Sequence, residues 1–127
     1  PLPMLENLLP ESVKAKASVH LGEWAWKGAD VFAAIDAAAG LRLAVVLGDP
    51  RLTLPHGMYE FAVDTAGEEE MHRDGESWPA FVERSADEAT RALRRLLAER
   101  SWLDGQEFVP KDVGDVEWVL YFVEERR

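Results

Sequence analysis

The run VEWVLYFVE, from Val116 to Glu124, predicts a β-sheet, because it is rich in the β-branched and aromatic residues that favour strands. Side chains alternate between the two faces of a strand. One face of this strand carries Val116, Trp118, Leu120 and Phe122. The other face carries Val119, Tyr121 and Val123. A strand with two apolar faces is either central in a sheet and covered twice, or it presents one face to a partner.

Two further segments predict strands. Leu41 to Leu47, LRLAVVL, is almost wholly apolar, as in an interior strand. A structural turn that ends this strand is predicted at Gly48 and Asp49, before Pro50. Met58 to Asp64, MYEFAVD, alternates apolar and polar residues, as in a half-buried strand. The intervening residues predict an irregular loop, and an antiparallel pair is the simplest way to join the two strands.

Two segments predict helices. Ala29 to Ala39 is rich in alanine, has an apolar stripe, and is followed by Gly40, a residue favoured just after a helix. Ser77 is a favoured N-cap, and with Pro79 in the first turn it predicts a long helix that ends near Arg100. The acidic residues of this helix come early and its arginines come late, which complements the helix dipole.

These elements predict an α+β fold in a single domain that spans residues 1–127. We expect a small, mostly antiparallel sheet of about three to four strands that packs against two main helices. Residues 1–22 predict a short N-terminal helical segment, in which Ser18 to Leu21 also alternates weakly as a strand would. Glu107 to Val109 is a further candidate for a short strand.

The chain carries 24 acidic and 14 basic residues, which gives a net charge of −10. This charge repels phosphate backbones and anionic membranes, so we expect neither nucleic acid nor a membrane as a partner. A basic protein is the complementary partner, because opposed potentials speed encounter, although excess acid also confers solubility by itself. With no cysteine and no apolar run near the ~20 residues of a membrane helix, we expect a cytoplasmic protein.

The negative charge is concentrated between Asp64 and Ser77. This segment holds six acidic residues and a single arginine, Arg73. One interpretation is a solvated connector whose acids complement the N-terminus of the following helix. The other is a docking patch for a cationic protein, where close charge pairs contribute to binding. The candidate contact residues of such a patch are Glu68, Glu69, Glu70, Asp74 and Glu76.

The sequence offers little that would support chemistry. The histidines, His20, His56 and His72, share no metal-binding spacing. The sequence contains no GxSxG elbow, no SxxK pair and no glycine-rich phosphate loop. We therefore expect no catalytic residue, no metal site and no cofactor. One alternative stays open, a small metal-dependent hydrolase in which His56 and His72 converge with Asp49 or Glu70.

The order of the elements between about Trp24 and Val123 follows a known pattern. It comprises an alanine-rich helix at Ala29 to Ala39, an apolar strand that ends in Leu47-Gly48-Asp49, an aromatic strand with Tyr59 and Phe61, a helix that carries Trp78, Phe81, Val82, Ser85 and Ala89, and a hydrophobic final strand. In this order and spacing the chain resembles the immunity protein 40 family of bacterial polymorphic toxin systems. The family pattern has a second glycine where this chain has Leu47.

The resemblance implies a small cytoplasmic α+β protein that binds and neutralises a cognate toxin domain and is not an enzyme. It names no contact residue. Together with the charge, it leads us to expect a non-catalytic inhibitor that uses its acidic loop against a basic toxin, for example a nuclease. The alternative from a third class is a homodimeric scaffold that pairs through the second apolar face of the final strand, at Val119, Tyr121 and Val123.

Overall fold

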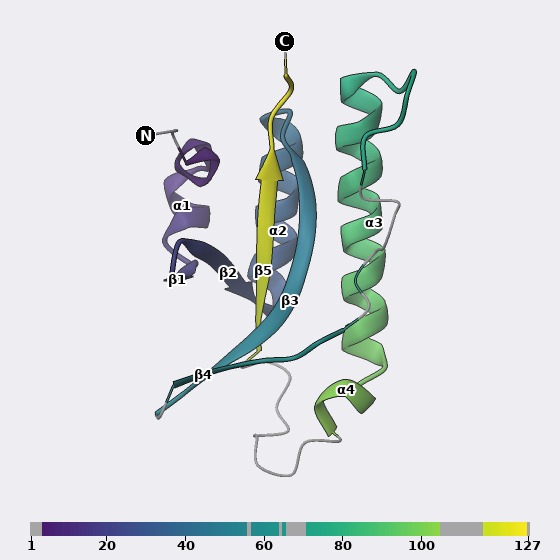
Figure 1. Ribbon diagram of the computed structural model, residues 1–127. Helices are drawn as coiled ribbons and strands as arrows, with labels where there is room; N and C mark the ends of the chain where they lie inside the picture. The colour runs from purple at the N-terminus through teal and green to yellow at the C-terminus, as the bar shows by residue number, and fades with distance from the viewer. Residues whose placement is uncertain (1–3, 56, 64, 66–70, 105–115, 127) are drawn as a thin grey trace.

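The computed structural model describes residues 4–55, 57–63, 65, 71–104 and 116–126. In these residues an antiparallel sheet with the strand order β1-β2-β5-β3-β4 is curled into a half-barrel (Figure 1). The strands are β1 (Ser18–His20), β2 (Glu23–Lys27), β3 (Ala44–Leu54), β4 (Gly57–Glu60) and β5 (Glu117–Val123). The helices are the 3-10 helix η1 (Leu5–Leu8), α1 (Glu11–Lys14), α2 (Gly28–Gly40), α3 (Trp78–Ala98) and α4 (Ser101–Asp104). The predicted α+β class is confirmed.

The predicted number of strands, three to four, is wrong, because five strands lie in the described part of the chain. The sequence left β1 open, and no strand was predicted at the segment of β2. These strands have only three and five residues, so they are too short to give a clear period. The N-terminal segment is helical as predicted only as far as Lys14, since β1 follows it. Glu107 to Val109 lies outside the described residues.

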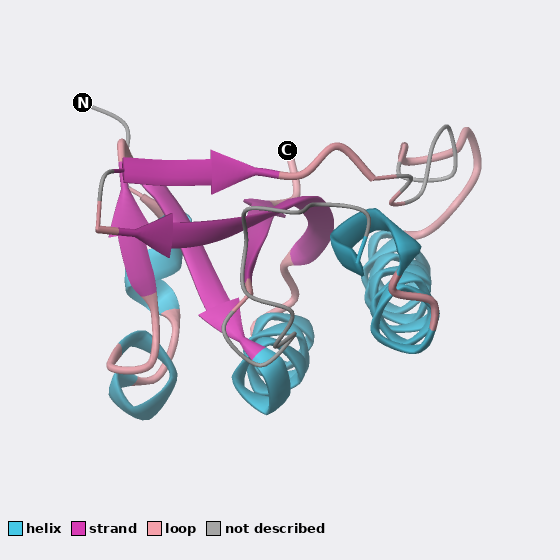
Figure 2. Cartoon of the chain, turned by 90° about the horizontal axis from the view of Figure 1, so that it is seen from below, coloured by secondary structure: helices cyan, strands magenta, loops and turns pink. Residues whose placement is uncertain are grey.

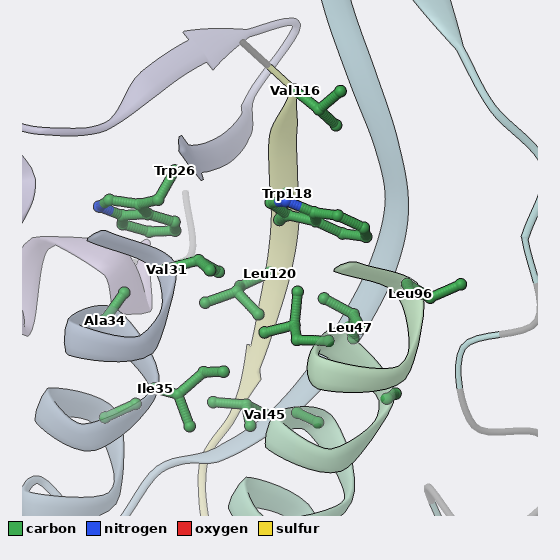
Figure 3. Close-up of a cluster of buried hydrophobic side chains, with 14 of the residues drawn as sticks. Trp26, Val31, Ala34, Ile35, Val45, Leu47, Leu96, Val116, Trp118 and Leu120 are labelled. Atoms are coloured by element: carbon green, nitrogen blue, oxygen red, sulfur yellow. The ribbon is translucent and has the colours of Figure 1, made fainter. Parts of the chain in front are cut away.

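The predicted strand at the end of the chain is β5, which lies at the centre of the sheet between β2 and β3. Trp118 is paired with Trp26 of β2, and Leu120 is paired with Leu47 of β3. These side chains form one core with α2 and α3, as Figure 3 shows, and the core includes Val31 and Ile35 of α2 and Leu93 and Leu96 of α3. The first apolar face of β5 is therefore the face that packs against the helices.

Both main helices are confirmed, and α3 also contacts the edge of β3. Ser77 caps α3 by accepting a hydrogen bond from the backbone N–H of Ala80 at 3.2 Å. Ser85 of α3 accepts a hydrogen bond from the backbone N–H of Val45 at 3.1 Å. In Figure 2, α3 accordingly lies beside the sheet, and α2 lies below it. A helix thus shields part of the β3 edge that β4 does not reach. No helix in the described ranges is both long and apolar enough to cross a membrane.

The predicted turn at Gly48 and Asp49 is wrong, because β3 continues through these residues to Leu54. The pairing of β3 with β5 shifts in register between Leu47 and Pro50, as at a β-bulge. Proline cannot donate a ladder hydrogen bond, so within a strand it is tolerated at such an irregularity. The predicted irregular loop is accordingly replaced by the end of β3 and a short connection to β4. The second predicted strand is confirmed only in β4, which ends at Glu60.

Candidate functional site

The second face of β5, opposite the helix-packed face, is only partly covered. Val119 is 3% exposed, whereas Tyr121 is 43% and Val123 is 38% exposed. Of the three residues predicted to form an apolar surface, only Tyr121 and Val123 are therefore exposed, and Val119 is buried. Val46 of β3 is paired with Tyr121 and is half-buried. We call the exposed part of this face the Tyr121 face.

Three carboxylates act on the hydroxyl of Tyr121. The hydroxyl of Tyr121 donates a hydrogen bond to the carboxylate of Glu23 on β2. This bond is the main reason why the pKa of Tyr121 is raised to about 12, and partial burial and the negative charges of Glu23, Glu60 and Asp49 raise it further. Tyr121 is thus a protonated, half-exposed aromatic residue in an acidic environment. We include Glu23, Asp49 and Glu60 in the Tyr121 face.

A pocket of about 640 Å³ adjoins the Tyr121 face. It lies between the end of β5 and the start of α3, and we call it the β5–α3 pocket. Its apolar lining consists of Val46, Met71, Trp78, Phe81 and Val123. Its polar lining consists of His72, Glu76, Glu124, Glu125 and Arg126. Pockets of about 300 to 1,000 Å³ with mainly apolar walls and a few polar groups are typical of binding sites.

His72 forms a wall of this pocket. Its ring stacks on Phe81, with ring centres 4.9 Å apart, and meets Trp78 edge to face at 5.6 Å. The ring nitrogen Nε2 donates to the carbonyl of Glu76 at 2.7 Å, because a carbonyl can only accept. Trp78 is fixed in turn by its indole N–H, which donates to the carbonyl of Arg42 at 2.7 Å. The aromatic side chains of the pocket are therefore held in place by contacts within the protein.

Glu76, a predicted contact residue, has an internal role. Its carboxylate accepts hydrogen bonds from Nε and Nη2 of Arg84 at 2.7 and 2.9 Å, and from the backbone N–H of Arg73 at 3.1 Å. The bond with Arg84 is the main reason why the pKa of Glu76 is lowered to about 2. Arg84 also donates to the carbonyl of Met71 at 2.6 Å. Glu76 and Arg84 thus attach the segment 71–77 to α3.

The other predicted contact residues are either outside the described part of the chain or exposed. Glu68, Glu69 and Glu70 lie outside the described residues. Asp74 is exposed and makes no hydrogen bond or ion pair within the described part of the chain. Asp74 and Glu76 thus lie on one short segment. Of the two, only Asp74 has a carboxylate that no other described residue binds, so only Asp74 is available to a partner.

The metal-site alternative gains no support from the described residues. His56 and Glu70 lie outside them. His72 packs on aromatic rings, and Asp49 accepts a hydrogen bond from the backbone N–H of Val63 at 3.4 Å. Among the residues that the structure describes, no three histidine, cysteine or acidic side chains lie close enough together to hold a metal ion.

Sequence reasoning missed Glu23, Glu60, Glu124 and Glu125 as site residues. Each looked like an ordinary surface acid, because the segments that carry them are far apart in the sequence. The available signal was the alternation of β5, which placed Tyr121 and Val123 on one face and left open whether that face is covered. Comparison with protein-family models, curated proteins and solved structures gives no match for this chain. The resemblance to immunity protein 40 therefore stays a prediction.

Proposed function

We propose that this chain is a non-catalytic immunity protein that binds a cognate bacterial toxin domain and neutralises it. The observation that carries the proposal is the Tyr121 face, where a half-exposed aromatic residue is hydrogen-bonded to Glu23 and lies within the negative field of Asp49 and Glu60. Tyrosine is enriched among the residues that dominate binding energy at protein interfaces. Carboxylates around such an anchor favour encounter with a basic surface and reject an acidic one.

The net charge of −10 supports the same kind of partner. A toxin domain that acts on nucleic acid needs a basic surface for the phosphate backbone, and an acidic inhibitor can compete for that surface. The resemblance to immunity protein 40 supplies the class of partner, a toxin domain of a polymorphic toxin system. In this proposal the Tyr121 face replaces the acidic loop as the main contact.

The acidic surroundings also argue against the homodimeric alternative. Two copies that met through the Tyr121 face would bring like charges together, and like-charge juxtaposition costs several kcal/mol. We therefore propose a monomer that binds its toxin, and sedimentation at several protein concentrations tests this. A mass that doubles with concentration would favour the dimer.

The first test is survival of bacteria that express the C-terminal domain of the protein encoded next to this one, with and without this chain. We expect this chain to restore growth and to co-purify with that domain. If the domain kills in the presence of this chain, or is harmless alone, the proposed function is wrong.

A second test places the contact. Tyr121→Ala should weaken binding by about tenfold or more, as expected for an anchor residue. Asp49→Lys with Glu60→Lys should slow association and flatten its dependence on salt. The matched control is Asp36→Lys with Asp87→Lys, which reverses two exposed acids on α2 and α3. Equal effects of the two double variants would show that only net charge matters.

A further inference from the structure

The β5–α3 pocket combines an apolar floor with an acidic rim. Trp78 and Phe81 form part of the floor, with their ring centres 5.4 Å apart in an edge-to-face contact. Both rings are buried and belong to the same small cluster as Ala44. Met71 and Val123 extend the apolar surface outward, since they are 72% and 38% exposed. The pocket can therefore receive an aliphatic chain that continues into solvent.

The charged residues at the rim determine which sign of ligand charge the pocket favours. Glu124 and Glu125 are exposed and make no hydrogen bond or ion pair with any other part of the chain that the structure describes. Glu76 is already paired with Arg84, so its charge is compensated within the protein. Arg126 supplies one positive charge against the two carboxylates of Glu124 and Glu125. A cation is therefore favoured over an anion at this rim.

A purely apolar ligand fits the rim less well than an amphipathic one. Closing the pocket over Glu124 and Glu125 would remove water from their carboxylates without giving them a partner, which is unfavourable. Long basic side chains combine both requirements, because lysine and arginine bury their aliphatic stems on apolar surface and keep the charged group at the edge. The pocket wall is also preformed, since the contacts of His72 and Arg84 fix the segment 71–77. A preformed wall reduces the entropy lost on binding.

We propose that the β5–α3 pocket receives a lysine or arginine side chain of a partner protein, with its stem on the floor and its charged group at Glu124 and Glu125. The identity of the partner rests on the proposed function, in which it is the toxin domain. The chemistry of the pocket does not rest on it. Because Val46 and Val123 belong to the Tyr121 face as well as to the pocket, one partner surface can cover both.

The pocket can be tested without any partner by nuclear magnetic resonance. We would titrate the protein with n-butylguanidinium, which imitates an arginine side chain, and separately with pentanoate, a chain of similar length with the opposite charge. The methyl signals of Met71, Val46 and Val123 report on the floor. We expect saturable shifts with n-butylguanidinium, with a dissociation constant on the order of 10 mM, and much smaller shifts with pentanoate. Equal or stronger binding of pentanoate, or no shift with either compound, overturns the proposal.

Variants assign the binding to the rim. Glu124→Gln with Glu125→Gln should weaken n-butylguanidinium binding about threefold, as expected for exposed ion pairs. Asp36→Asn, an exposed acid on α2, should leave it unchanged. If the rim variant binds the probe as tightly as the wild type, the assignment to Glu124 and Glu125 is wrong.

The toxin experiment separates this inference from the proposed function. If the wild type neutralises the toxin and the rim variant binds it with unchanged affinity, the pocket inference fails and the proposed function stands. If the wild type does not bind the toxin but binds n-butylguanidinium in the pocket, the proposed function fails and the pocket chemistry stands.

Discussion

Gly48 of β3 lies directly against the ring of Tyr121 on the neighbouring strand. A Cβ atom at position 48 would lie 2.8 Å from Cε2 of Tyr121 and 3.2 Å from Cγ1 of Val119. Glycine is therefore required here for a close approach between the two strands, and not for a turn. Because the hydroxyl of Tyr121 is bonded to Glu23, a displacement of the ring also disturbs that bond.

The first prediction follows from this contact. Gly48→Ala should lower the free energy of unfolding by about 1 to 3 kcal/mol, as overpacking does, and should displace the ring of Tyr121. Urea denaturation measures the stability. The matched control is Gly40→Ala at the end of α2, where no atom beyond the neighbouring residues and the backbone of the helix itself lies within 4 Å of the added Cβ. That variant should be neutral or slightly stabilising, since alanine favours helices. Equal stability of both variants would contradict the contact.

The second prediction concerns the ionisation of Tyr121. Its pKa is about 12 in the folded protein, against an ordinary value of 10.0. The unfolded chain therefore releases the proton more readily, so the stabilisation from this group is complete below pH 10 and is lost as the pH rises through about 12. In Tyr59→Phe, Tyr121 is the remaining tyrosine of two, so the tyrosinate absorbance reports it alone. We expect a midpoint near 12.

Two observations would decide this second prediction. Adding Glu23→Gln to Tyr59→Phe removes the charged acceptor and should move the midpoint toward 10. Circular dichroism over the same range shows whether the chain is still folded. A midpoint near 10 in folded Tyr59→Phe would mean that the bond between Tyr121 and Glu23 does not form in solution.

The third prediction concerns the pair of Glu76 and Arg84. The pKa of Glu76 is lowered to about 2 from 4.5, so the unfolded state binds this proton first as the pH falls. The stabilisation from the pair is therefore complete above pH 4.5 and is lost as the pH falls through about 2. The free energy of unfolding of the wild type should fall more steeply across this range than that of Glu76→Gln. Parallel pH profiles would rule out the pair as the cause.

A variant of the partner residue gives an independent control for the third prediction. Arg84→Lys keeps the positive charge but loses the fork that binds both oxygens of Glu76. In this variant we expect the pKa of the Glu76 carboxyl group, measured by nuclear magnetic resonance, to lie between the wild-type value and 4.5. Because Arg84 also holds the carbonyl of Met71, the signals of the segment 71–77 should shift in this variant.

The elements that the sequence predicted well have long periodic patterns. The segments of α2, α3 and β5 were identified from one stretch of chain each, because their side chains repeat with the helical or strand period over several residues. The turn at Gly48 was predicted wrongly because Gly-Asp-Pro is locally a turn sequence, and only the pairing with β5 shows that it is a strand irregularity.

The candidate site was less predictable for a different reason. Glu23, Asp49, Glu60 and Tyr121 come from four different strands, and strand order and register alone bring them together. Local counting of charges found the acidic segment before α3, but it could not show that Glu76 is paired with Arg84. Charge density along the chain thus located a region, whereas the assignment of roles required the tertiary contacts.

The last prediction concerns Arg51, which shows how strongly the sheet is curled. Its Nη2 donates to the carbonyl of Ser18 at 2.8 Å, although β2 and β5 lie between β3 and β1 in the sheet. The same nitrogen lies 3.8 Å from Oε2 of Glu117, which also accepts a hydrogen bond at Oε1 from the hydroxyl of Thr53. Arg51 and Glu117 are both buried, so each charge depends on the other.

Arg51→Met should therefore lower the free energy of unfolding by about 3 to 5 kcal/mol, because it leaves the charge of Glu117 buried without its partner. Arg51→Met with Glu117→Leu should recover most of that loss, since two apolar side chains of similar size can replace a buried ion pair. Urea denaturation of the wild type, both single variants and the double variant completes the cycle. If the two single losses simply add in the double variant, Arg51 and Glu117 are not coupled, and the carbonyl of Ser18 alone accounts for the role of Arg51.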